Sequence, residues 1–573
     1  MKNINFLNRK LIFSIFLLQL AFNSAYAQWS TDPSENNVIC NAALDQRYPL
    51  IISDGSGGAI ITWTIDRRYT DTDENIYAQR INSTGFVQWI ANGATICDAS
   101  RNQNSTAIVS DGSGGAIITW ADFRDINQLY QIYAQKINSA GLVQWTGNGV
   151  KICNKTDGQF EPAIASDDSG GAIITWKDFR DGGAQANMYI QKIDSAGNFK
   201  WAENGIAICT APGIKSNITI MSDGFGGAII TWQDGRLGAD FSNIYTLKMD
   251  SAGILPWTPA VVILSDSKHA IFPTMTSDGS GGALYTWMDL RNGVGHHIYA
   301  QKVDSIGDVK WQLNGVAICT AAYTRNYPTI VSDGSGGAII TWEDFREGNS
   351  FTDIYAQKID SIGAVQWTAN GVAICTATAD QNNPTIVSDG SGGAIITWRD
   401  QRNYPGDIYA QRIDSTGTVQ WPENGIAIST AANNQYLPQI VSNGSGGAVI
   451  TWGDRRNGSS DDIYAQKVNV NGSLGDVTGI REEQSTRANF GLRNYPNPVK
   501  EKTIIGFEIS KAQMVSLKVY DLFGKEISTL INEKKTIGKH EIEFDASKIN
   551  PGIYLYKLHA GSFVITKKMI LIK

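Results

Sequence analysis

The chain has 573 residues and a formal net charge of −7, and no basic run or stripe occurs along it. This charge pattern argues against nucleic-acid binding, which requires an electrostatic footprint for phosphate. Glycine (58 residues) and tryptophan (16 residues) are frequent and helical periodicity is hard to find, so the composition favours an all-β protein.

The first 27 residues have the order of a secretory signal peptide. Basic residues at positions 2, 9 and 10 precede an apolar run over residues 11–22, and Ala25-Tyr26-Ala27 provides a small-x-small cleavage site before Gln28. The apolar run is shorter than the ~20 residues needed to cross a bilayer, so we expect residues 1–27 to be cleaved. No other segment is long and apolar enough, and we predict an exported chain without a membrane span.

After the signal peptide, one stretch recurs eight times. SDGSGGAIITW stands at residues 53–63, 110–120, 332–342 and 388–398, with close variants at 166–176, 222–232, 277–287 and 442–452. The tryptophans that close the eight copies are 54–57 residues apart, and a second series of eight accounts for the remaining tryptophans. A catalytic site is normally built once, whereas a structural unit is repeated, so the pattern predicts a repeat architecture.

The unit over residues 328–375 illustrates the expected strands. Glycine-rich turns and one longer loop separate four short strands: PTIVSD (328–333), AIITW (338–342), IYAQKID (354–360) and AVQW (364–367). The apolar runs are continuous rather than alternating, as expected for sheets covered on both faces. Four short strands in a radially repeated unit are typical of a β-propeller blade. NGVAIC (370–375) leads to the next unit or adds a fifth strand, which would place the loops differently.

The two ends of the repeat region complement each other. Residues 28–40 resemble the tail of a unit that lacks its front, and the eighth unit stops near Gly475 without that tail. Together the fragments make eight complete units, and a split unit that ties the first blade to the last is expected of a closed ring. We therefore predict an eight-bladed β-propeller over residues 28–475, with a β-solenoid or a string of small domains as the alternative.

The repeated Asp and Arg side chains are interpreted as structural. The Asp of SDGSGG could bind calcium, but each unit offers a single carboxylate where Ca²⁺ takes six or more oxygens, and Asp, Asn and Gly suit a tight turn. An Asp/Arg pair follows the Trp in seven units, whereas the first unit has Asp66-Arg67. Because catalysis would need one pair in an unlike environment, we expect blade-locking ion pairs at Asp122/Arg124, Asp178/Arg180, Asp234/Arg236, Asp289/Arg291, Asp344/Arg346, Asp400/Arg402 and Asp454/Arg456.

Cysteine and histidine give no recognisable site. Equivalent points on neighbouring stacked sheets lie ~10 Å apart, beyond the ~7 Å Cα separation that a disulfide tolerates. We therefore expect buried free thiols at the six equivalent positions 40, 97, 153, 209, 319 and 375. His296-His297 has no other metal ligand at a suitable spacing, and the acidic cluster Asp71, Asp73 and Glu74 is interpreted as a solvated loop. The sequence thus identifies no catalytic, cofactor-binding or metal-binding residue, and we expect no cofactor.

The repeat ends at Gly475 and a different domain follows. Residues 476–493 are polar and aperiodic, as in a linker, and alternating apolar strands between Gly and Pro turns over residues 494–573 predict a small β-sandwich. Its motifs are Asn494-Tyr495-Pro496-Asn497-Pro498, Val519-Tyr520-Asp521 with Gly524, Pro551-Gly552-Ile553-Tyr554, and Lys567, Lys568 and Lys573.

With these motifs, residues 494–573 resemble the C-terminal sorting domain of the type IX secretion system. The resemblance implies a Gram-negative source of the Bacteroidota type and a partner in the type IX secretion machinery. It also implies export through the outer membrane, followed by release or by attachment to the cell surface.

Two segments of each unit vary, whereas the hairpin turns keep their length. One joins the strand-end Arg to the next Tyr, and the other joins the Cys position to the next apolar strand. In a four-stranded blade both loops emerge on one face, which is therefore the expected binding face. We predict a non-enzymatic binding or adhesion module for an extracellular glycan or protein. The alternative is a secreted propeller glycoside hydrolase or lyase with two carboxylates in the central funnel, and a surface-layer component without a pocket is a third possibility.

Overall fold

The structure is a computed structural model of the chain, which forms two compact units, Met1–Asp476 and Val477–Lys573. The predicted signal peptide, residues 1–27, lies outside the described residues, as does nearly all of the predicted linker, residues 476–493. The structure describes residues 29–66, 74–125, 129–182, 185–238, 241–263, 269–348, 351–475, 492–509, 512–521, 525–560 and 563–572.

The described residues of the first unit form eight antiparallel sheets of four strands each, which we call blades one to eight in chain order. The innermost strands are β2 (Asp45–Ser53), β6 (Gln103–Ser110), β10 (Gln159–Ser166), β14 (Lys215–Ser222), β18 (Ala270–Ser277), β22 (Arg325–Ser332), β26 (Gln381–Ser388) and β30 (Gln435–Ser442). The second strands are β3 (Ala59–Asp66), β7 (Ala116–Asp122), β11 (Ala172–Asp178), β15 (Ala228–Asp234), β19 (Ala283–Asp289), β23 (Ala338–Asp344), β27 (Ala394–Asp400) and β31 (Ala448–Asp454).

The third and fourth strands of each blade are no longer than its second strand. The third strands are β4 (Glu74–Ile81), β8 (Gln131–Ile137), β12 (Asn187–Ile193), β16 (Asn243–Met249), β20 (His297–Val303), β24 (Asp353–Ile359), β28 (Asp407–Ile413) and β32 (Asp462–Val468). The outermost strands are β5 (Ala94–Cys97), β9 (Val150–Lys151), β13 (Ile206–Cys209), β17 (Val261–Val262), β21 (Val316–Cys319), β25 (Val372–Cys375), β29 (Ile426–Ser429) and, in the eighth blade, β1 (Asn37–Cys40).

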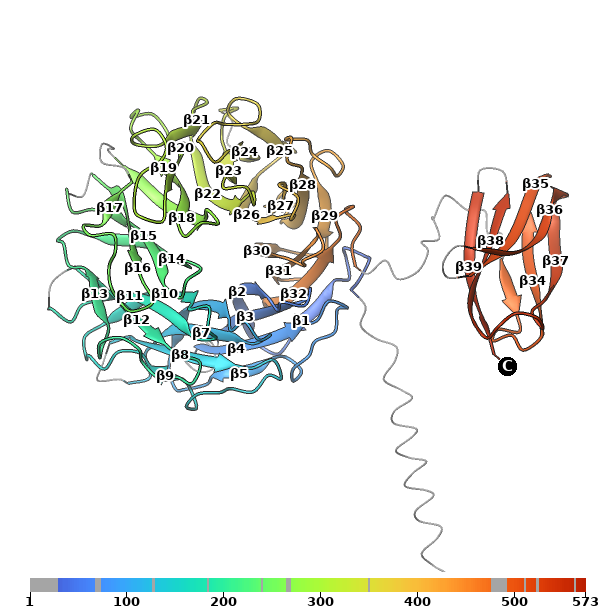
Figure 1. Cartoon of the computed structure of the whole chain (residues 1–573), viewed down its shortest axis with the longest axis horizontal. Helices are drawn as coiled ribbons and strands as arrows, with labels where there is room; N and C mark the ends of the chain where they lie inside the picture. Colours follow the sequence, from blue (N-terminus) through green and yellow to red (C-terminus); the bar gives the residue numbers. More distant parts are fainter. Residues whose placement is uncertain are drawn as a thin grey trace, which may run out of the picture. The chain divides into compact units, whose positions relative to one another are not determined.

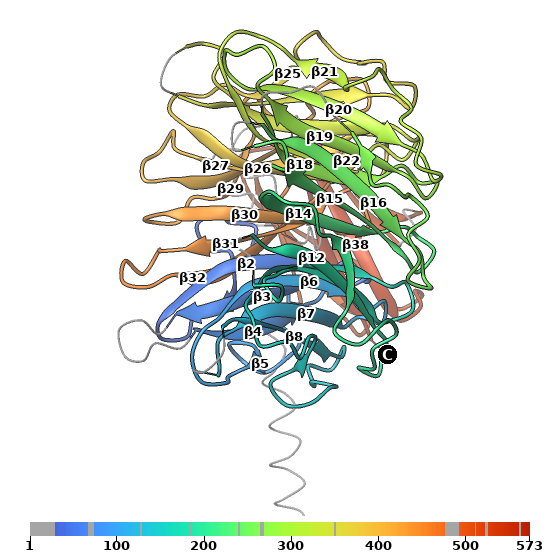
Figure 2. The same cartoon turned by 90° about the vertical axis from the view of Figure 1, so that its left-hand side faces the viewer.

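The blades form a closed ring (Figure 1), and successive blades pack face to face (Figure 2). Each innermost strand contacts the innermost strand of the next blade, and β30 contacts β2. The N-terminal strand β1 pairs with β32, so the eighth blade is completed by the start of the chain. Gly475 lies against Trp29, where an added Cβ would collide with the Trp29 carbonyl oxygen. The predicted all-β propeller, closed by two fragments of one blade, is confirmed.

The fourth strand differs from the prediction. In blade six it is VAIC, residues Val372–Cys375, whereas the AVQW segment makes the isolated bridge Val365–Ile359. The side chain of Gln357 explains this arrangement, because its Oε1 accepts a hydrogen bond from the Trp367 N–H (2.9 Å) and its Nε2 donates to the Thr368 carbonyl (2.8 Å). These backbone groups are therefore satisfied by a side chain instead of a strand. Each blade keeps four strands, so its two variable loops emerge at the same end.

The hydrophobic core lies between blades rather than within one blade. Ile60 and Ala78 of blade one pack with Ile118 and Trp120 of blade two in a cluster of buried side chains. Each further interface repeats this composition, and the eight inner tryptophans are fully buried: Trp63, Trp120, Trp176, Trp232, Trp287, Trp342, Trp398 and Trp452. Burial of both sheet faces explains why the strands are continuously apolar.

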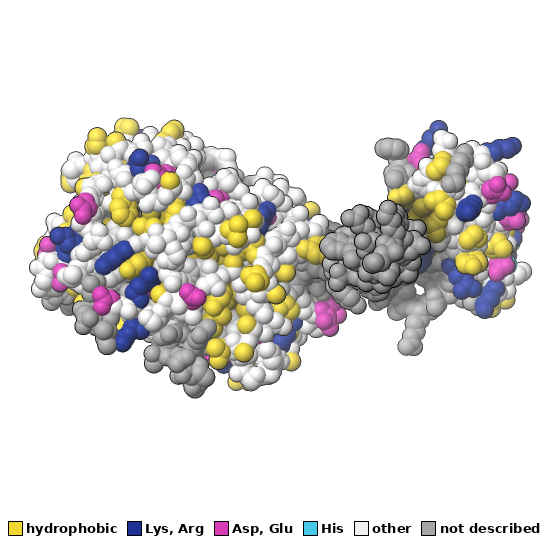
Figure 3. Space-filling model, turned by 90° about the horizontal axis from the view of Figure 1, so that it is seen from below, with side chains coloured by type: hydrophobic (Ala, Val, Ile, Leu, Met, Phe, Trp, Pro, Cys, Tyr) yellow, Lys and Arg dark blue, Asp and Glu magenta, His cyan; other side chains and the backbone are white. Residues whose placement is uncertain are grey.

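The second series of tryptophans ties each blade to the next. The indole N–H of Trp367 in blade six donates to the Ser415 carbonyl of blade seven (3.2 Å), and Trp29 donates to Ser83 of blade one (3.0 Å). The same bond occurs at every other interface, from Trp89, Trp145, Trp201, Trp257, Trp311 and Trp421. On the rim that Figure 3 shows, acidic and basic side chains are interspersed rather than gathered into one stripe.

The second unit is a β-sandwich, as predicted. One sheet contains β33 (Arg493–Tyr495), β34 (Lys502–Ile509) and β37 (Gly538–Asp545). The other contains β36 (Glu526–Lys535), β35 (Gln513–Tyr520), β38 (Gly552–Ala560) and β39 (Phe563–Leu571) in that order. Val499, Phe507, Leu517 and Tyr556 belong to the buried cluster of this unit. Among the described residues, no helix has the length and apolar character that a membrane crossing requires.

Candidate functional site

The SDGSGG segment is a hairpin turn, as predicted from its composition. In blade one, Asp54 Oδ1 accepts hydrogen bonds from the backbone N–H groups of Ser56 and Gly58, both at 2.8 Å, and its Oδ2 lies 2.9 Å from Arg80 Nη2. Both carboxylate oxygens are thus occupied by the protein itself. No group of three or more His, Cys, Asp or Glu side chains in the described part of the chain could hold a metal ion.

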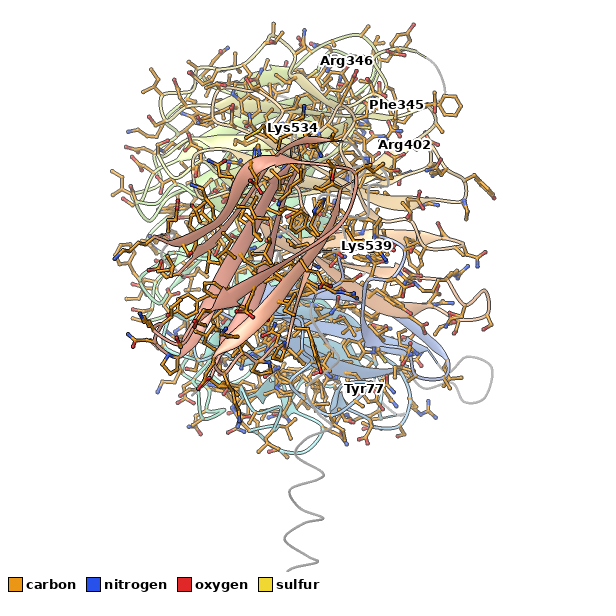
Figure 4. All side chains as sticks on the ribbon, turned by 90° about the vertical axis from the view of Figure 1, so that its right-hand side faces the viewer. Tyr77, Phe345, Arg346, Arg402, Lys534 and Lys539 are labelled. Carbon is orange, nitrogen blue, oxygen red and sulfur yellow. The ribbon has the colours of Figure 1, made fainter. Side chains whose placement is uncertain are left out.

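The Asp/Arg pairs form a buried network in seven blades. In blade seven, Asp400 accepts hydrogen bonds from the Trp398 indole N–H (2.8 Å) and from Arg402 Nη2 (2.7 Å), while Arg402 lies over the ring of Tyr409. The neighbouring blade contains the same arrangement around Arg346, and Figure 4 labels both arginines. Burial alone would raise the pKa of Asp344, but hydrogen bonds from Arg346 and Trp342 hold it below its ordinary value. The predicted blade-locking role is therefore supported by geometry.

Blade one lacks this network. Ile65 occupies the position of the carboxylate, and the indole N–H of Trp63 has no hydrogen-bond partner among the described residues. Arg67 lies outside the described residues, as do Asp71 and Asp73 of the acidic cluster, whereas Glu74 begins β4.

The six cysteines are buried and free, as predicted. Each lies at an interface between blades. Cys375, for example, is 3.1 Å from Arg402 Nη2 of the next blade. Burial raises the pKa of the Cys375 thiol to about 12, so this thiol is protonated and unreactive at neutral pH.

The second residue of the histidine pair lies beside an arginine. His297 begins β20, and its Nδ1 lies 3.4 Å from Nη1 of Arg325. Burial lowers the pKa of His296 and of His297, and the Arg325 charge lowers the pKa of His297 further.

The structure reveals a further set of positions that sequence reasoning missed. The innermost strand of every blade contains a β-bulge, visible as a register shift against the second strand. One residue in each bulge has a left-handed backbone, with φ between 48° and 55°. We call these residues the bulge ring: Tyr48, Ser105, Glu161, Asn217, Phe272, Tyr327, Asn383 and Leu437.

The bulge ring differs from blade to blade, and so do the residues beside it. The residue that follows each inner Trp pairs with the residue that precedes the bulge ring, as Glu343 pairs with Asn326 and Arg399 with Asn382. These eight Trp+1 residues are all different: Thr64, Ala121, Lys177, Gln233, Met288, Glu343, Arg399 and Gly453. Unlike residues in otherwise repeated blades are expected where a surface is built for a ligand rather than for packing.

Five consecutive blades enclose a pocket at the bulge ring. It has a volume of about 370 Å³ and is lined by fifteen residues, three each from β14, β18, β22, β26 and β30. We call it the channel pocket because all of its walls are innermost strands (Figure 1). Phe272 and Tyr327 lie on its wall with 37% and 48% of their surface exposed, and their rings pack edge to face at 5.4 Å.

A buried carboxyl group stands directly behind this wall. Glu343 is only 5% exposed, and its Oε1 accepts a hydrogen bond from the backbone N–H of Asn383 (2.7 Å), which lines the pocket. Burial, and to a smaller extent the nearby Asp380 charge, raise the pKa of Glu343 to about 7, although the Asn383 hydrogen bond opposes them. In the next blade, Arg399 donates hydrogen bonds to the carbonyl of Pro405 (2.9 Å) and to Asn434 Oδ1 (3.0 Å).

The other blades carry different chemistry at the same level. Glu161 of the bulge ring forms an ion pair with Lys177 at 2.6 Å. A second hollow, of about 450 Å³, lies between blades one and two and is lined by Tyr48, Glu74 and Ser105 among others. The mouth of the ring is therefore chemically asymmetric, although its frame is nearly eightfold.

Comparisons with known proteins define the C-terminal unit most clearly. Residues 493–573 match the family model described as Secretion system C-terminal sorting domain. This confirms the resemblance inferred from the sequence motifs. No curated protein matches the chain.

Several solved structures resemble the chain at low identity. An endo-arabinase from Bacteroides thetaiotaomicron is 12% identical, covers 54% of this chain and 93% of its own, and has a TM-score of 0.28. An α-L-arabinofuranosidase from Fusarium graminearum is 10% identical over 55% of this chain and 93% of its own, with a TM-score of 0.30. An ulvan lyase is 10% identical over 65% of this chain and 93% of its own, with a TM-score of 0.41.

These structures contradict the expectation of a protein without catalytic activity, because the proteins they represent are enzymes by name. The non-enzymatic prediction is therefore withdrawn. The sequence reasoning behind it relied on the uniformity of the repeat and did not detect the bulge ring, where the blades differ. Identities of 10–12% assign neither a reaction nor a substrate to this chain.

Proposed function

We propose that this protein, which its sorting domain directs through type IX secretion to the cell surface or the extracellular space, is a polysaccharide-cleaving enzyme whose site is the channel pocket. The observation that carries the proposal is the pocket itself. It is a concave site with exposed aromatic rings and a few amides, built from the innermost positions at which otherwise similar blades differ. Apolar walls with a few polar groups are typical of sites that bind small molecules or segments of polymers.

Hydrolysis is the proposed chemistry. Glu343 does not line the pocket: it is 5% exposed behind the wall and accepts the backbone N–H of Asn383. We therefore propose Glu343 as a positioning residue that holds the Asn383 backbone of the wall. Asp380 Oδ1 accepts hydrogen bonds from the backbone N–H (3.0 Å) and the hydroxyl (3.2 Å) of Thr352.

In the proposed reaction the bond from the glycosidic oxygen to the anomeric carbon breaks. Water supplies the hydroxyl group for the anomeric carbon, and its remaining proton goes to the departing oxygen. The products are two shorter chains, one with a new reducing end.

The test is a screen of polysaccharides with the mature protein, in which new reducing ends and unsaturated sugar ends are measured separately. Reducing ends without unsaturated ends are expected. Unsaturated ends would identify a lyase instead, and absence of cleavage of any polymer would overturn the proposal.

A matched pair of variants separates the pocket from the frame. Tyr327→Asn introduces the residue that blade seven has at the same position, Asn383, and should weaken polymer binding at least tenfold. Phe225→Ser introduces the residue that all seven other blades have in the hairpin turn, at the opposite end of the blades, and should leave binding unchanged. Equal effects of the two substitutions would place the site elsewhere.

A further inference from the structure

The channel pocket contains no charged side chain among its fifteen lining residues. Its polar groups are hydroxyls and amides, with Asn217, Asn383 and Gln439 contributed by three different blades. An amide both donates and accepts hydrogen bonds, as a sugar hydroxyl does. Phe272 and Tyr327 supply the exposed apolar surface.

The charged side chains beside the pocket are engaged by the protein itself. Arg399 of blade seven donates to Pro405 O (2.9 Å) and Asn434 Oδ1 (3.0 Å), and in blade three, outside the five blades of the pocket, Lys177 is bound to Glu161 at 2.6 Å. Glu343 accepts the Asn383 N–H from behind the wall. Recognition of carboxylate or sulfate groups usually employs arginines that present a free fork to the ligand, and no arginine lines this pocket.

The floor of the pocket is also preorganised. A proline follows the bulge-ring residue in blades five to eight, at Pro273, Pro328, Pro384 and Pro438, and all four line the pocket. Proline fixes its own φ, so the backbone directly after each of these bulge-ring residues has little freedom before a ligand arrives. A rigid wall cannot bring a distant cation to an anionic ligand at low cost.

We infer that the channel pocket accepts a neutral polysaccharide, built from sugars without carboxylate or sulfate groups. This inference rests on the proposed function and narrows its substrate class. A neutral sugar can place an apolar face on Phe272 or Tyr327 and its hydroxyls on the amides. An anionic sugar would lose hydration in the pocket without gaining a cation.

The test compares neutral polymers, such as a β-mannan and an arabinan, with anionic ones, such as polygalacturonate and a sulfated galactan. Binding to the mature protein is measured by calorimetry at 50 and 500 mM NaCl, with product release measured in parallel. At least one neutral polymer should bind tenfold more tightly than every anionic one, and its affinity should change less than twofold with salt, because no ion pair is formed.

Tighter binding of an anionic polymer, weakened by salt, would overturn the inference and leave the proposed function standing. Absence of both binding and cleavage for all polymers would overturn both.

Discussion

The two ends of each blade follow different rules. At the hairpin end, every blade repeats an Asx turn and an indole bond to the next blade, and in blades one to seven a basic side chain binds the Asp of the turn. At the bulge end the Asp/Arg network repeats in seven blades, but the bulge-ring and Trp+1 residues beside it differ in almost every blade. The frame is uniform because one packing solution is used at eight interfaces, whereas the bulge ring can vary because it packs against the channel instead of a neighbouring core. Substitutions in the repeated frame and in the bulge ring should therefore have opposite consequences for stability and for ligand binding.

The largest effect on stability is expected in the frame. Asp400→Ala would leave the Trp398 indole N–H and the Arg402 guanidinium without their buried acceptor. Removing one partner of a buried ion pair costs about 3–5 kcal/mol, and urea unfolding at pH 7 measures it. Asp400→Asn, which retains an acceptor oxygen, should cost clearly less, and equal losses would argue against the network as the cause.

A smaller effect of opposite sign is expected behind the channel pocket. The pKa of Glu343 is raised to about 7, so its ionisation destabilises the folded state as the pH rises from about 4.5 to 7. Glu343→Gln removes that cost and should raise the free energy of unfolding by roughly 3 kcal/mol at pH 8, since one pKa unit corresponds to about 1.4 kcal/mol. The difference should vanish near pH 4. A pH-independent difference would show that packing, not ionisation, is responsible.

A single interface bond has a more modest effect. Trp367→Phe removes the indole N–H that donates to the Ser415 carbonyl, while most of the buried ring is retained. A typical hydrogen bond contributes about 1 kcal/mol, and a loss of about 1–2 kcal/mol is expected in urea unfolding. A double-mutant cycle with a substitution at a distant blade should be additive, and strong coupling would indicate that the blades do not act locally.

The smallest change in stability is expected in the bulge ring. Asn adopts a left-handed backbone more readily than Tyr, so Tyr327→Asn should change the free energy of unfolding by less than about 0.5 kcal/mol. The same substitution is expected to weaken polymer binding at least tenfold. Destabilisation above 1 kcal/mol would mean that the bulge ring stabilises the packing of the blades, as the repeated frame does.

Repetition made the frame predictable from the sequence. Tryptophan spacing, glycine-rich turns and the complementary chain ends identified the propeller, because eight copies of one pattern average out local ambiguity. The fourth strand was misplaced, since the Gln357 side chain satisfies backbone groups that would otherwise pair as a strand. A side chain that replaces the hydrogen bonds of a neighbouring strand leaves no periodic pattern in the sequence.

The channel pocket could not be predicted in the same way. Its bulge-ring residues do not repeat from blade to blade. In sequence they look like unselected variation before an apolar strand, as in Asn326-Tyr327 before Pro328 and Asn382-Asn383 before Pro384. A bulge with a left-handed residue decides that these side chains face the channel, and Tyr or Leu at such a position gives no warning of a positive φ. One signal was available, because the eight different Trp+1 residues stand inside an otherwise constant stretch.

The meeting of Trp29 and Gly475 has a practical consequence. Whatever precedes the propeller in the chain and whatever follows it depart from one spot on the rim of the eighth blade, beside β32. Along the described rest of the rim, the propeller has no other chain end. A label or surface linkage attached at that spot would therefore fix the propeller at one point of its rim and leave the central channel open to a long polymer.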